Sequence, residues 1–327
     1  MKILIIGGTG PTGSFMVEEL LSRGHQVTIY HTGTHEVAFS SPVEHIHGDP
    51  RELGDLQRDL GGRSFDAAVN TAGRIRHVIE VLRGRVGRLV AISGMGVYRD
   101  LYAGMPVPIP EEAPLHADPS GNRFYYNVVQ GERAVMEAHE QGRFTATLLR
   151  YPLIYGPRAI PPFDWYWVRR VLDGRPWVLL PGDGLTLPQR GYARNLAHAV
   201  VLALESPQAA GQVYNTGDER CLPVRALAQV VAEALGHRWE LISVPFAQAP
   251  PGNPFATPCH TLLDLSKIKA ELGYRDLVGA EEATRQTALW LREHPPTEGE
   301  LDPRYFQQAF DYEAEDQIVQ RLRAQTS

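Results

Sequence analysis

The chain is poor in lysine, in cysteine and in long apolar runs, and each shortage excludes a class of protein. Only three residues are lysines, and the net charge is −6, so the chain lacks the basic field of a general nucleic-acid binder. No apolar run approaches the roughly 20 residues that span a bilayer. Residues 1–10 do not resemble a signal peptide. We therefore expect a cytoplasmic protein with neither a membrane nor a nucleic-acid partner.

The few cysteines and the scattered histidines indicate neither a disulfide nor a metal site. Cys221 and Cys259 lie far apart in the sequence, and a reducing compartment favours two free thiols. His31 and His35 are four residues apart, and residues 45 and 47 place two histidines on one face of a predicted strand. Neither pair comes with the cysteine or carboxylate set of a metal site, so we predict no metal.

Short apolar runs alternate with helical patterns through the first half of the chain. Strands are predicted at residues 3–6, 26–30, 43–47, 66–70, 88–93 and 145–150. Helices are predicted at residues 13–22, 55–60, 75–83 and 126–141. This alternation is typical of α/β proteins with a parallel sheet and helices on both faces. The sequence therefore predicts a Rossmann fold, a doubly wound parallel sheet.

The second half is less regular, and residues 156–190 are rich in proline, glycine and tryptophan. Helices are predicted at residues 191–205, 224–235, 280–293 and 313–324, and a strand at 212–215. We predict that residues 1–155 with about 189–216 form the dinucleotide-binding domain. Residues 156–188 with 217–300 would form a smaller substrate domain, and residues 301–327 a helical C-terminal tail.

A glycine-rich loop directly follows the first predicted strand and opens a helix. Residues 7–13 read Gly-Gly-Thr-Gly-Pro-Thr-Gly. Glycine permits a tight turn and lets the backbone approach a pyrophosphate, which the N-terminus of the next helix attracts. The alternative is a tight turn without a ligand. The candidate cofactor-binding residues of this loop are Gly7, Gly10, Pro11, Thr12 and Gly13.

The end of the second predicted strand determines the choice between NAD and NADP in such folds. An acidic residue there binds the ribose hydroxyls of NAD, and an arginine accommodates the phosphate of NADP. Here the strand ends with Tyr-His-Thr-Gly, which offers neither. His31 and Thr32 can donate to a 2′-phosphate, so the prediction leans slightly to NADP. The alternatives are that His31 is a surface residue or that Glu36 reaches back to this point.

Further segments follow in a fixed order at residues 47–49 (HGD), 70–73 (NTAG), 91–98 (AISGMGVY), 150–157 (RYPLIYGP) and 191–197 (GYARNLA). With the glycine loop they resemble the NAD-dependent epimerase/dehydratase group of extended and atypical short-chain dehydrogenases/reductases, over roughly residues 1–295. The resemblance implies an NAD or NADP cofactor, a small-molecule substrate and a monomer or homodimer. It also implies that the cofactor is bound by Asp49, Thr71, Ala72, Gly73, Pro152 and Ile154.

The sequence departs from this family at the catalytic motif. The family uses Tyr-x-x-x-Lys with a nearby serine, and the lysine lowers the pKa of the tyrosine so that it can act as a general acid/base. Alignment on Glu132 puts Phe124 and Val128 at these positions. Alignment on Tyr126 instead puts Gln130 where the lysine belongs, so the lysine is lost in both registers.

Hydroxyl groups near this position remain as candidate catalytic residues. The serine position falls on Gly94, with Ser93 one residue before it. Tyr125 and Tyr126 can donate a hydrogen bond to a substrate oxygen, but a phenol without a cationic neighbour keeps a pKa near ~10. The alternative for these side chains is simple packing. Two glutamates at residues 111–112 are candidate bases, although solvated loop charges are the favoured interpretation.

The substrate side is predicted from residues 163–170, a segment that lies beside the substrate in extended members of this family. Trp165 and Trp167 are candidates for the wall of an apolar pocket, with core packing as the alternative. Arg158 and Arg190 are candidates for clamping a diphosphate, with ordinary surface roles as the alternative.

The leading functional hypothesis is an atypical family member that binds NAD(P) and acts on a small organic substrate by redox chemistry, dehydration or isomerisation without the Tyr-x-x-x-Lys relay. One alternative keeps the fold but uses no hydride transfer, as in a lyase, cyclase or isomerase. Another is a non-catalytic protein that senses NAD(P) or associates with RNA.

Overall fold

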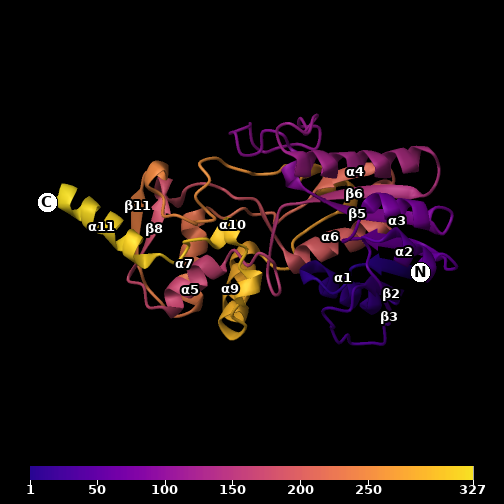
Figure 1. Cartoon of the computed structure of the whole chain (residues 1–327), viewed down its shortest axis with the longest axis horizontal. Helices are drawn as coiled ribbons and strands as arrows, with labels where there is room; N and C mark the ends of the chain where they lie inside the picture. Colours follow the sequence, from indigo (N-terminus) through magenta and orange to yellow (C-terminus); the bar gives the residue numbers. More distant parts are fainter. Residues whose placement is uncertain (327) are drawn as a thin grey trace.

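The computed structural model describes residues 1–326 and contains a central sheet of seven strands in the order β10-β6-β5-β4-β1-β2-β3 (Figure 1). All neighbouring pairs are parallel. The strands are β1 (Lys2–Ile6), β2 (Gln26–His31), β3 (Glu44–His47), β4 (Phe65–Asn70), β5 (Val86–Gly94), β6 (Thr145–Tyr151) and β10 (Gln212–Asn215). The order reverses between β1 and β4, and in such sheets ligands bind at the carboxyl ends of the strands beside that point. The predicted doubly wound α/β fold is confirmed.

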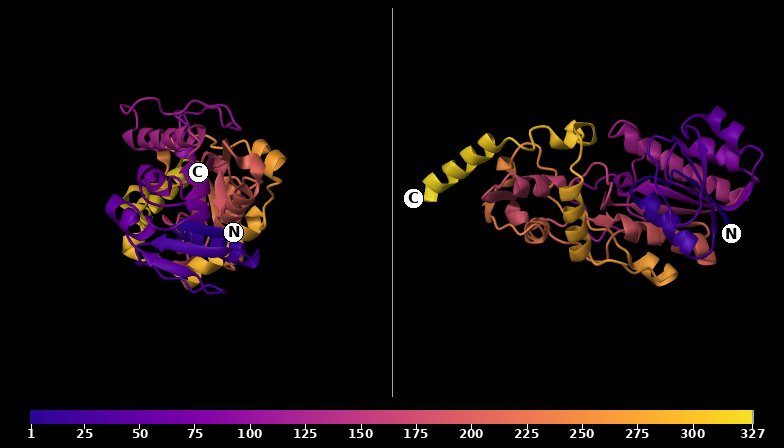
Figure 2. Two further views of the ribbon diagram at one scale, coloured as in Figure 1. Left: turned by 90° about the vertical axis from the view of Figure 1, so that its right-hand side faces the viewer. Right: turned by 90° about the horizontal axis from the view of Figure 1, so that it is seen from below.

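Helices cover both faces of this sheet (Figures 1 and 2). One face carries α1 (Pro11–Ser22) and α6 (Ala193–Glu205), and the other carries α2 (Leu53–Leu60), α3 (Ile75–Leu82) and α4 (Arg123–Glu140). In β1, Ile3 and Ile5 belong to one apolar core, and Leu4 and Ile6 belong to the other. The strand is buried on both faces, which explains its unbroken apolar sequence.

The rest of the chain forms a second region, which is built around a separate apolar core. It contains the parallel pair β8 (Trp177–Pro181) and β11 (Glu240–Val244), and the helices α5 (Trp165–Leu172), α7 (Val224–Ala234) and α9 (Ala280–Glu293). A second short parallel pair, β7 (Leu153–Tyr155) and β9 (Arg190–Tyr192), lies where the chain passes between the two regions. Smaller helices are α8 (Ser266–Leu272) and α10 (Pro303–Phe306).

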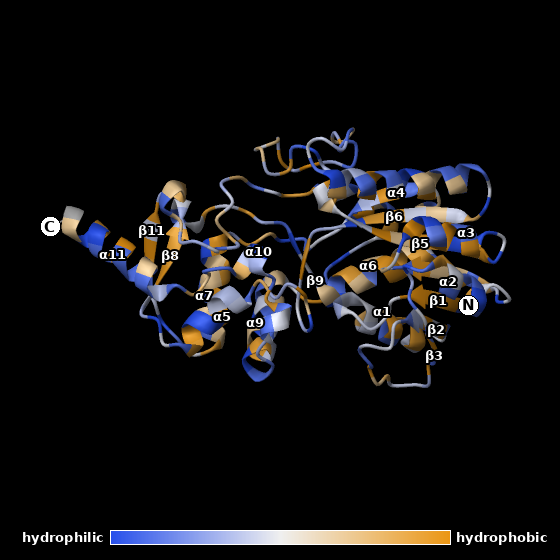
Figure 3. Cartoon of the chain, viewed as in Figure 1, coloured by the Kyte–Doolittle hydropathy of each residue, from blue (hydrophilic) through white to orange (hydrophobic). Residues whose placement is uncertain are grey.

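The C-terminal helix α11 (Tyr312–Thr326) extends from the second region, at the opposite end of the molecule from the N-terminus (Figures 1 and 2). It confirms the helix predicted at residues 313–324. It is attached through a buried ion pair between Arg170 of α5 and Glu315 and through an apolar cluster of Ile318 and Val319 with β8 and β11. Apolar residues concentrate in the strands and on the inner faces of the helices, and α11 is largely hydrophilic (Figure 3). Among the described helices, none combines the length and the hydropathy needed to cross a bilayer.

Candidate active site

The glycine loop between β1 and α1 has the backbone geometry that only glycine adopts readily. Gly7 and Gly8 have φ values of 108° and 95°. A Cβ atom at Gly13 would lie 2.6 Å from the carbonyl carbon of Gly8, so α1 begins in direct contact with the loop. No side chain caps α1, which begins at Pro11 after Gly10. No side chain caps the backbone N–H groups of Thr12 and Gly13, so they can bind an anion.

The turn after β4 touches the glycine loop, and the loop after β3 touches that turn, all at one edge of the sheet. The hydroxyl and the backbone N–H of Thr71 both donate to the carbonyl of Ile6, at 2.9 and 3.0 Å. A Cβ at Gly7 would lie 2.1 Å from Oγ1 of Thr71. A Cβ at Gly73 would lie 2.4 Å from the carbonyl oxygen of Pro50, so the turn after β4 also contacts the loop after β3. The segments predicted to bind the cofactor therefore lie side by side.

The remaining residues predicted to bind the cofactor lie around this edge. Asp49 lies just after β3 and forms an ion pair with Arg51 at 3.0 Å, which holds the pKa of the Asp49 carboxyl below its usual range. Pro152 is buried directly after β6, at its carboxyl end. Ile154 lies in β7, paired with Gly191 of β9.

At the end of β2, Glu36 reaches back to the histidines of β3. Its carboxylate lies 3.1 Å from Nδ1 of His45 and 3.0 Å from Nε2 of His47. His31 is only 5% exposed, its Nε2 lies 3.2 Å from Nδ1 of His45, and burial lowers its pKa. Thr32 is exposed, and its hydroxyl bonds that of Thr34 at 2.8 Å. Of the interpretations left open by the sequence, the structure matches the one in which Glu36 returns to this point.

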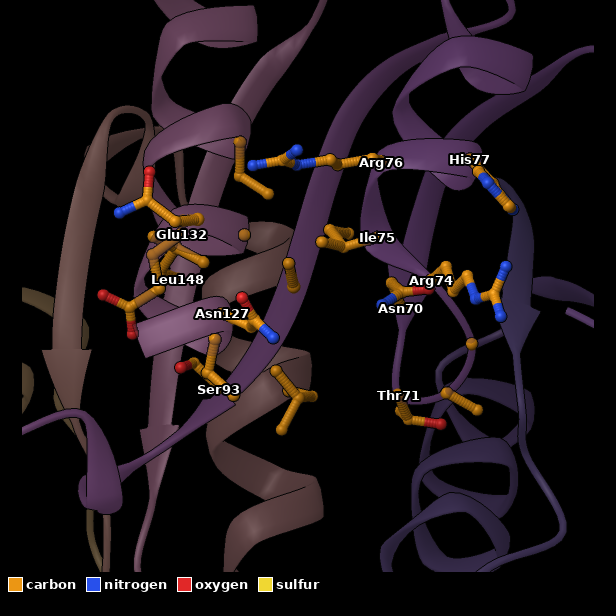
Figure 4. Close-up of a pocket in the computed structure, with 18 of the residues that line it drawn as sticks. Asn70, Thr71, Arg74, Ile75, Arg76, His77, Ser93, Asn127, Glu132 and Leu148 are labelled. Carbon is orange, nitrogen blue, oxygen red and sulfur yellow. The ribbon is translucent and has the colours of Figure 1, made fainter. Parts of the chain in front are cut away.

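A cavity of about 720 Å³ opens beside the carboxyl ends of β4 and β5, between α3 and α4 (Figure 4). The turn that contains Thr71 forms one side, and Ser93 and Asn127 lie across from it (Figure 4). Three side chains that line it have a buried polar atom with no protein partner: Oδ1 of Asn70, Oγ of Ser93 and Nε2 of Gln130. Buried polar groups are normally paired, so these atoms can be satisfied by a polar ligand.

Both residues of the first catalytic register line this cavity. Phe124 and Val128 lie on its wall, as does Gln130, whereas Tyr126 is not among the residues that form it. The cavity therefore favours the register in which Phe124 stands at the tyrosine position and Val128 at the lysine position. Helix α4 contains no lysine. Lys267, one of the three lysines, lies far from α4 in the sequence, and its ammonium donates a hydrogen bond to the backbone carbonyl of Val213.

Two further positions near the motif differ in their surroundings. A Cβ at Gly94 would have one neighbour within 4 Å, the carbonyl oxygen of Tyr151 at 3.8 Å, so the backbone leaves room for a serine. Tyr125 lies against Gly96, where a Cβ would come within 2.0 Å of its ring, and it stacks on His116 with ring centroids 5.7 Å apart. Burial raises the pKa of Tyr125, which makes the phenol a hydrogen-bond donor and a poor base.

A buried polar network joins α4 to the sheet next to the cavity, and sequence reasoning did not find it. Glu132 of α4 forms an ion pair with Arg150 of β6 at 2.7 Å, and both side chains are almost fully buried. Arg150 also donates to the hydroxyl of Tyr98 and to the backbone carbonyl of Glu111. The Glu111 carboxylate accepts from the backbone N–H of Asn215 at 2.8 Å, and burial raises its pKa. The favoured expectation of a solvated charge at Glu111 is wrong.

Of the four side chains predicted to contact the substrate, three are buried inside the protein. Trp165 and Trp167 are 4% and 0% exposed and pack in the core of the second region, which was the alternative interpretation. The guanidinium of Arg190 is buried, pairs with both carboxylate oxygens of Asp164 at 2.8 and 2.6 Å, and lies over the ring of Tyr155. It is therefore already neutralised, and only Arg158 of the expected diphosphate clamp is exposed.

The model of the NAD dependent epimerase/dehydratase family matches residues 3–85 and 76–217. The chain belongs to this family. The matched residues include the glycine loop, the cavity and all of α4.

Individual relatives are distant. A chloroplast stem-loop binding protein of 41 kDa from Arabidopsis thaliana is 27% identical over 251 residues, which cover 72% of this chain and 63% of that protein. A UDP-N-acetyl-alpha-D-glucosaminuronate decarboxylase from Bacillus cytotoxicus is 25% identical over 327 residues, covering 89% of this chain and 98% of the relative. The UDP-glucose 4-epimerase of Thermus thermophilus, solved with NAD, has a TM-score of 0.70 and 25% identity over 89% of this chain and 99% of that chain.

Proposed function

We propose that the protein binds NAD across the carboxyl edge of its sheet and acts on a small organic substrate without the Tyr-x-x-x-Lys relay. The observation that carries the proposal is the contact between the glycine loop and the turn after β4. Gly7 and Thr71 lie so close together that a side chain at position 7 would collide with Thr71. This contact supports a pyrophosphate position at the free N-terminus of α1. The family model and the NAD-bound structure of the Thermus thermophilus epimerase support the same cofactor.

Glu36 favours NAD over NADP, which reverses the slight preference for NADP that we inferred from the sequence. The neutral ring of His31 is buried against His45, so it offers no charge to a 2′-phosphate. The exposed carboxylate of Glu36 at the end of β2 would repel that phosphate. It can instead accept hydrogen bonds from ribose hydroxyls, the role that an acidic residue has at this position in related folds.

The cavity beside β4 and β5 is the proposed place of the reaction. NAD would supply a hydride acceptor there when bound. Asn70, Ser93 and Gln130 would orient a polar substrate through their unpaired atoms, and the apolar rings and side chains of α4 would exclude water. Tyr125 is not among the residues that line this cavity, and its raised pKa makes it a poor candidate for the base. The named relatives include a nucleotide-sugar decarboxylase and dTDP-glucose 4,6-dehydratases, which makes nucleotide sugars the first substrates to test.

A second candidate is a protein that binds NAD without hydride chemistry. Gly94, Phe124 and Val128 carry none of the functional groups of the family relay, and this observation favours it. The Arabidopsis relative is named a stem-loop binding protein, which makes RNA a further ligand to test. The net charge of −6 gives no general support for binding to phosphate backbones.

The proposal is tested by titrating the protein with NADH and NADPH and by repeating both titrations with Glu36→Gln. We expect NADH to bind more tightly than NADPH, and the variant to lose that preference. Turnover is then followed as the redox state of the nicotinamide with UDP- and dTDP-sugars. Binding without any redox change, across these substrates, would favour the second candidate. Failure of both nucleotides to bind at millimolar concentration would contradict the proposal.

A further inference from the structure

Three histidines and one glutamate converge at the outer edge of the sheet from three separate segments. His31 ends β2, Glu36 lies in the loop that follows, and His45 and His47 lie in β3. Each side chain offers one nitrogen or oxygen atom, and these four atoms all lie within 4.8 Å of one another. The sequence did not reveal this group because its members are spaced irregularly, and only the parallel register that pairs His31 with His47 brings them together.

We propose that His31, Glu36, His45 and His47 form a binding site for a divalent transition metal of the zinc class. Three imidazoles and one carboxylate are ligands that Zn²⁺ accepts in a four-coordinate tetrahedral site. With ligand bonds of about 2.0–2.1 Å, neighbouring ligand atoms in a tetrahedron lie about 3.4 Å apart. The separations His31–His45, Glu36–His45 and Glu36–His47 are 3.0 to 3.2 Å, close to that value, and all four atoms lie within 4.8 Å of one another. Imidazole ligands favour such metals over Mg²⁺ or Ca²⁺, which prefer oxygen.

The surroundings of the four residues suit a metal in other respects. More than half of the Glu36 and His47 side chains is exposed, whereas His31 is only 5% exposed. The group is therefore open to solvent on one side and buried against the sheet on the other. A bound ion would also fasten the loop that carries Glu36 to β2 and β3, because this loop supplies one ligand and the strands supply three.

The site goes beyond the proposed function but shares Glu36 with it: the metal takes one oxygen of the Glu36 carboxylate and leaves the other for the ribose of NAD. Metal binding is therefore tested without cofactor or substrate. The full chain, stripped with a chelator, is titrated calorimetrically with Zn²⁺. We expect one ion to bind per chain with a micromolar or tighter dissociation constant. Co²⁺ provides a second readout, because its visible absorption reports tetrahedral coordination.

Matched variants separate this group from other histidines. His47→Ala and Glu36→Ala alter exposed side chains, so the fold should be retained, and each should weaken Zn²⁺ binding at least tenfold, about 1.4 kcal/mol. His35→Ala changes an exposed histidine of the same loop that lies outside the group, and it should bind Zn²⁺ as the unchanged protein does. The proposal is overturned if the unchanged protein binds no Zn²⁺ at micromolar concentration, or if the group variants and His35→Ala bind it equally well.

Discussion

The loops after β1 and β4 and the facing ends of β5 and α4 lie on two sides of the proposed ligand site, and they match different parts of the family pattern. The glycine loop has every geometric feature needed for a dinucleotide: positive φ at Gly7 and Gly8, an uncapped helix start and close contact with Thr71. Across the cavity, the proposed register places Gly94, Phe124 and Val128 at the three relay positions. Cofactor binding depends on backbone shape and proton transfer depends on functional groups, so the two properties can separate in one fold.

The α4 side has nevertheless kept its architecture. Glu132 and Arg150 still form a buried ion pair that ties α4 to β6, although the relay positions eight and four residues earlier in the helix carry apolar side chains. On the proposed register, the relay side chains have changed without any loss of packing in the helix that carries them.

The largest effect is expected from breaking this ion pair. Glu132→Ala would leave Arg150 buried and unpaired, and removing one partner of a buried pair costs about 3–5 kcal/mol. The free energy of unfolding, measured by chemical denaturation, should fall by that amount. Glu137→Ala is the control on the same helix, because that side chain is exposed and should change stability by about 0.5 kcal/mol or less. Equal effects of the two substitutions would show that the pair does not anchor α4.

The next effect concerns the glycine loop. A Cβ at Gly10 would meet no protein atom within 4 Å, and its φ of −76° suits any residue. Gly10→Val should therefore fold normally but place methyl groups where the pyrophosphate must lie. NADH affinity should fall at least tenfold, about 1.4 kcal/mol, while the unfolding temperature stays unchanged. Gly54→Ala in α2, where a Cβ also meets nothing, is the control and should bind NADH normally. Unaltered binding by Gly10→Val would remove the loop from the cofactor site.

A lysine introduced into α4 at the proposed relay position tests whether the cofactor lies against this helix. Val128→Lys puts an ammonium into the cavity, where the family lysine would hold the nicotinamide ribose, and NADH affinity should rise about tenfold through charged hydrogen bonds. Gln130→Lys tests the other register on the same helix and should not show this gain. A larger gain for Gln130→Lys would mean that Tyr126 occupies the tyrosine position.

The smallest effect is a pH dependence at Glu111. Burial raises the pKa of this carboxyl in the folded protein, so the folded state holds its proton at a pH where the unfolded chain has lost it. The contribution to stability is therefore present at low pH and is lost as pH rises through the raised pKa. Glu111→Gln, which can still accept from the backbone N–H of Asn215, should flatten this decline and be slightly more stable at neutral pH. Denaturation curves of both proteins from acidic to neutral pH measure the difference, and an unchanged slope would contradict it.

Local patterns in the sequence were sufficient to predict the sheet and the glycine loop. The apolar run of β1 followed at once by glycines specifies a buried strand, a tight turn and a helix start, each decided by neighbouring residues. The short strands β7, β8 and β9 were missed because they lie in or beside the proline-rich segment and are only three to five residues long.

Side-chain partners far apart in the sequence could not be predicted. Arg190 was a candidate for clamping a diphosphate, but the fold places Asp164 against it. For Trp165 and Trp167 the sequence left a pocket wall and core packing both open, and only the fold shows the core. The cluster around Glu36 depends on the register of β2 against β3, which no local pattern fixes. The cavity likewise depends on how α3 and α4 are spaced over the sheet.

The most direct measurement is a crystal structure of the protein grown with NAD. We predict that the pyrophosphate lies at the N-terminus of α1 against Gly10–Gly13, and that the nicotinamide ribose lies near Val128 with no lysine beside it. Glu36 should face the adenosine ribose. Density for NAD elsewhere on the molecule, or an empty glycine loop at saturating NAD, would contradict the conclusion that the cofactor side of the site has been kept.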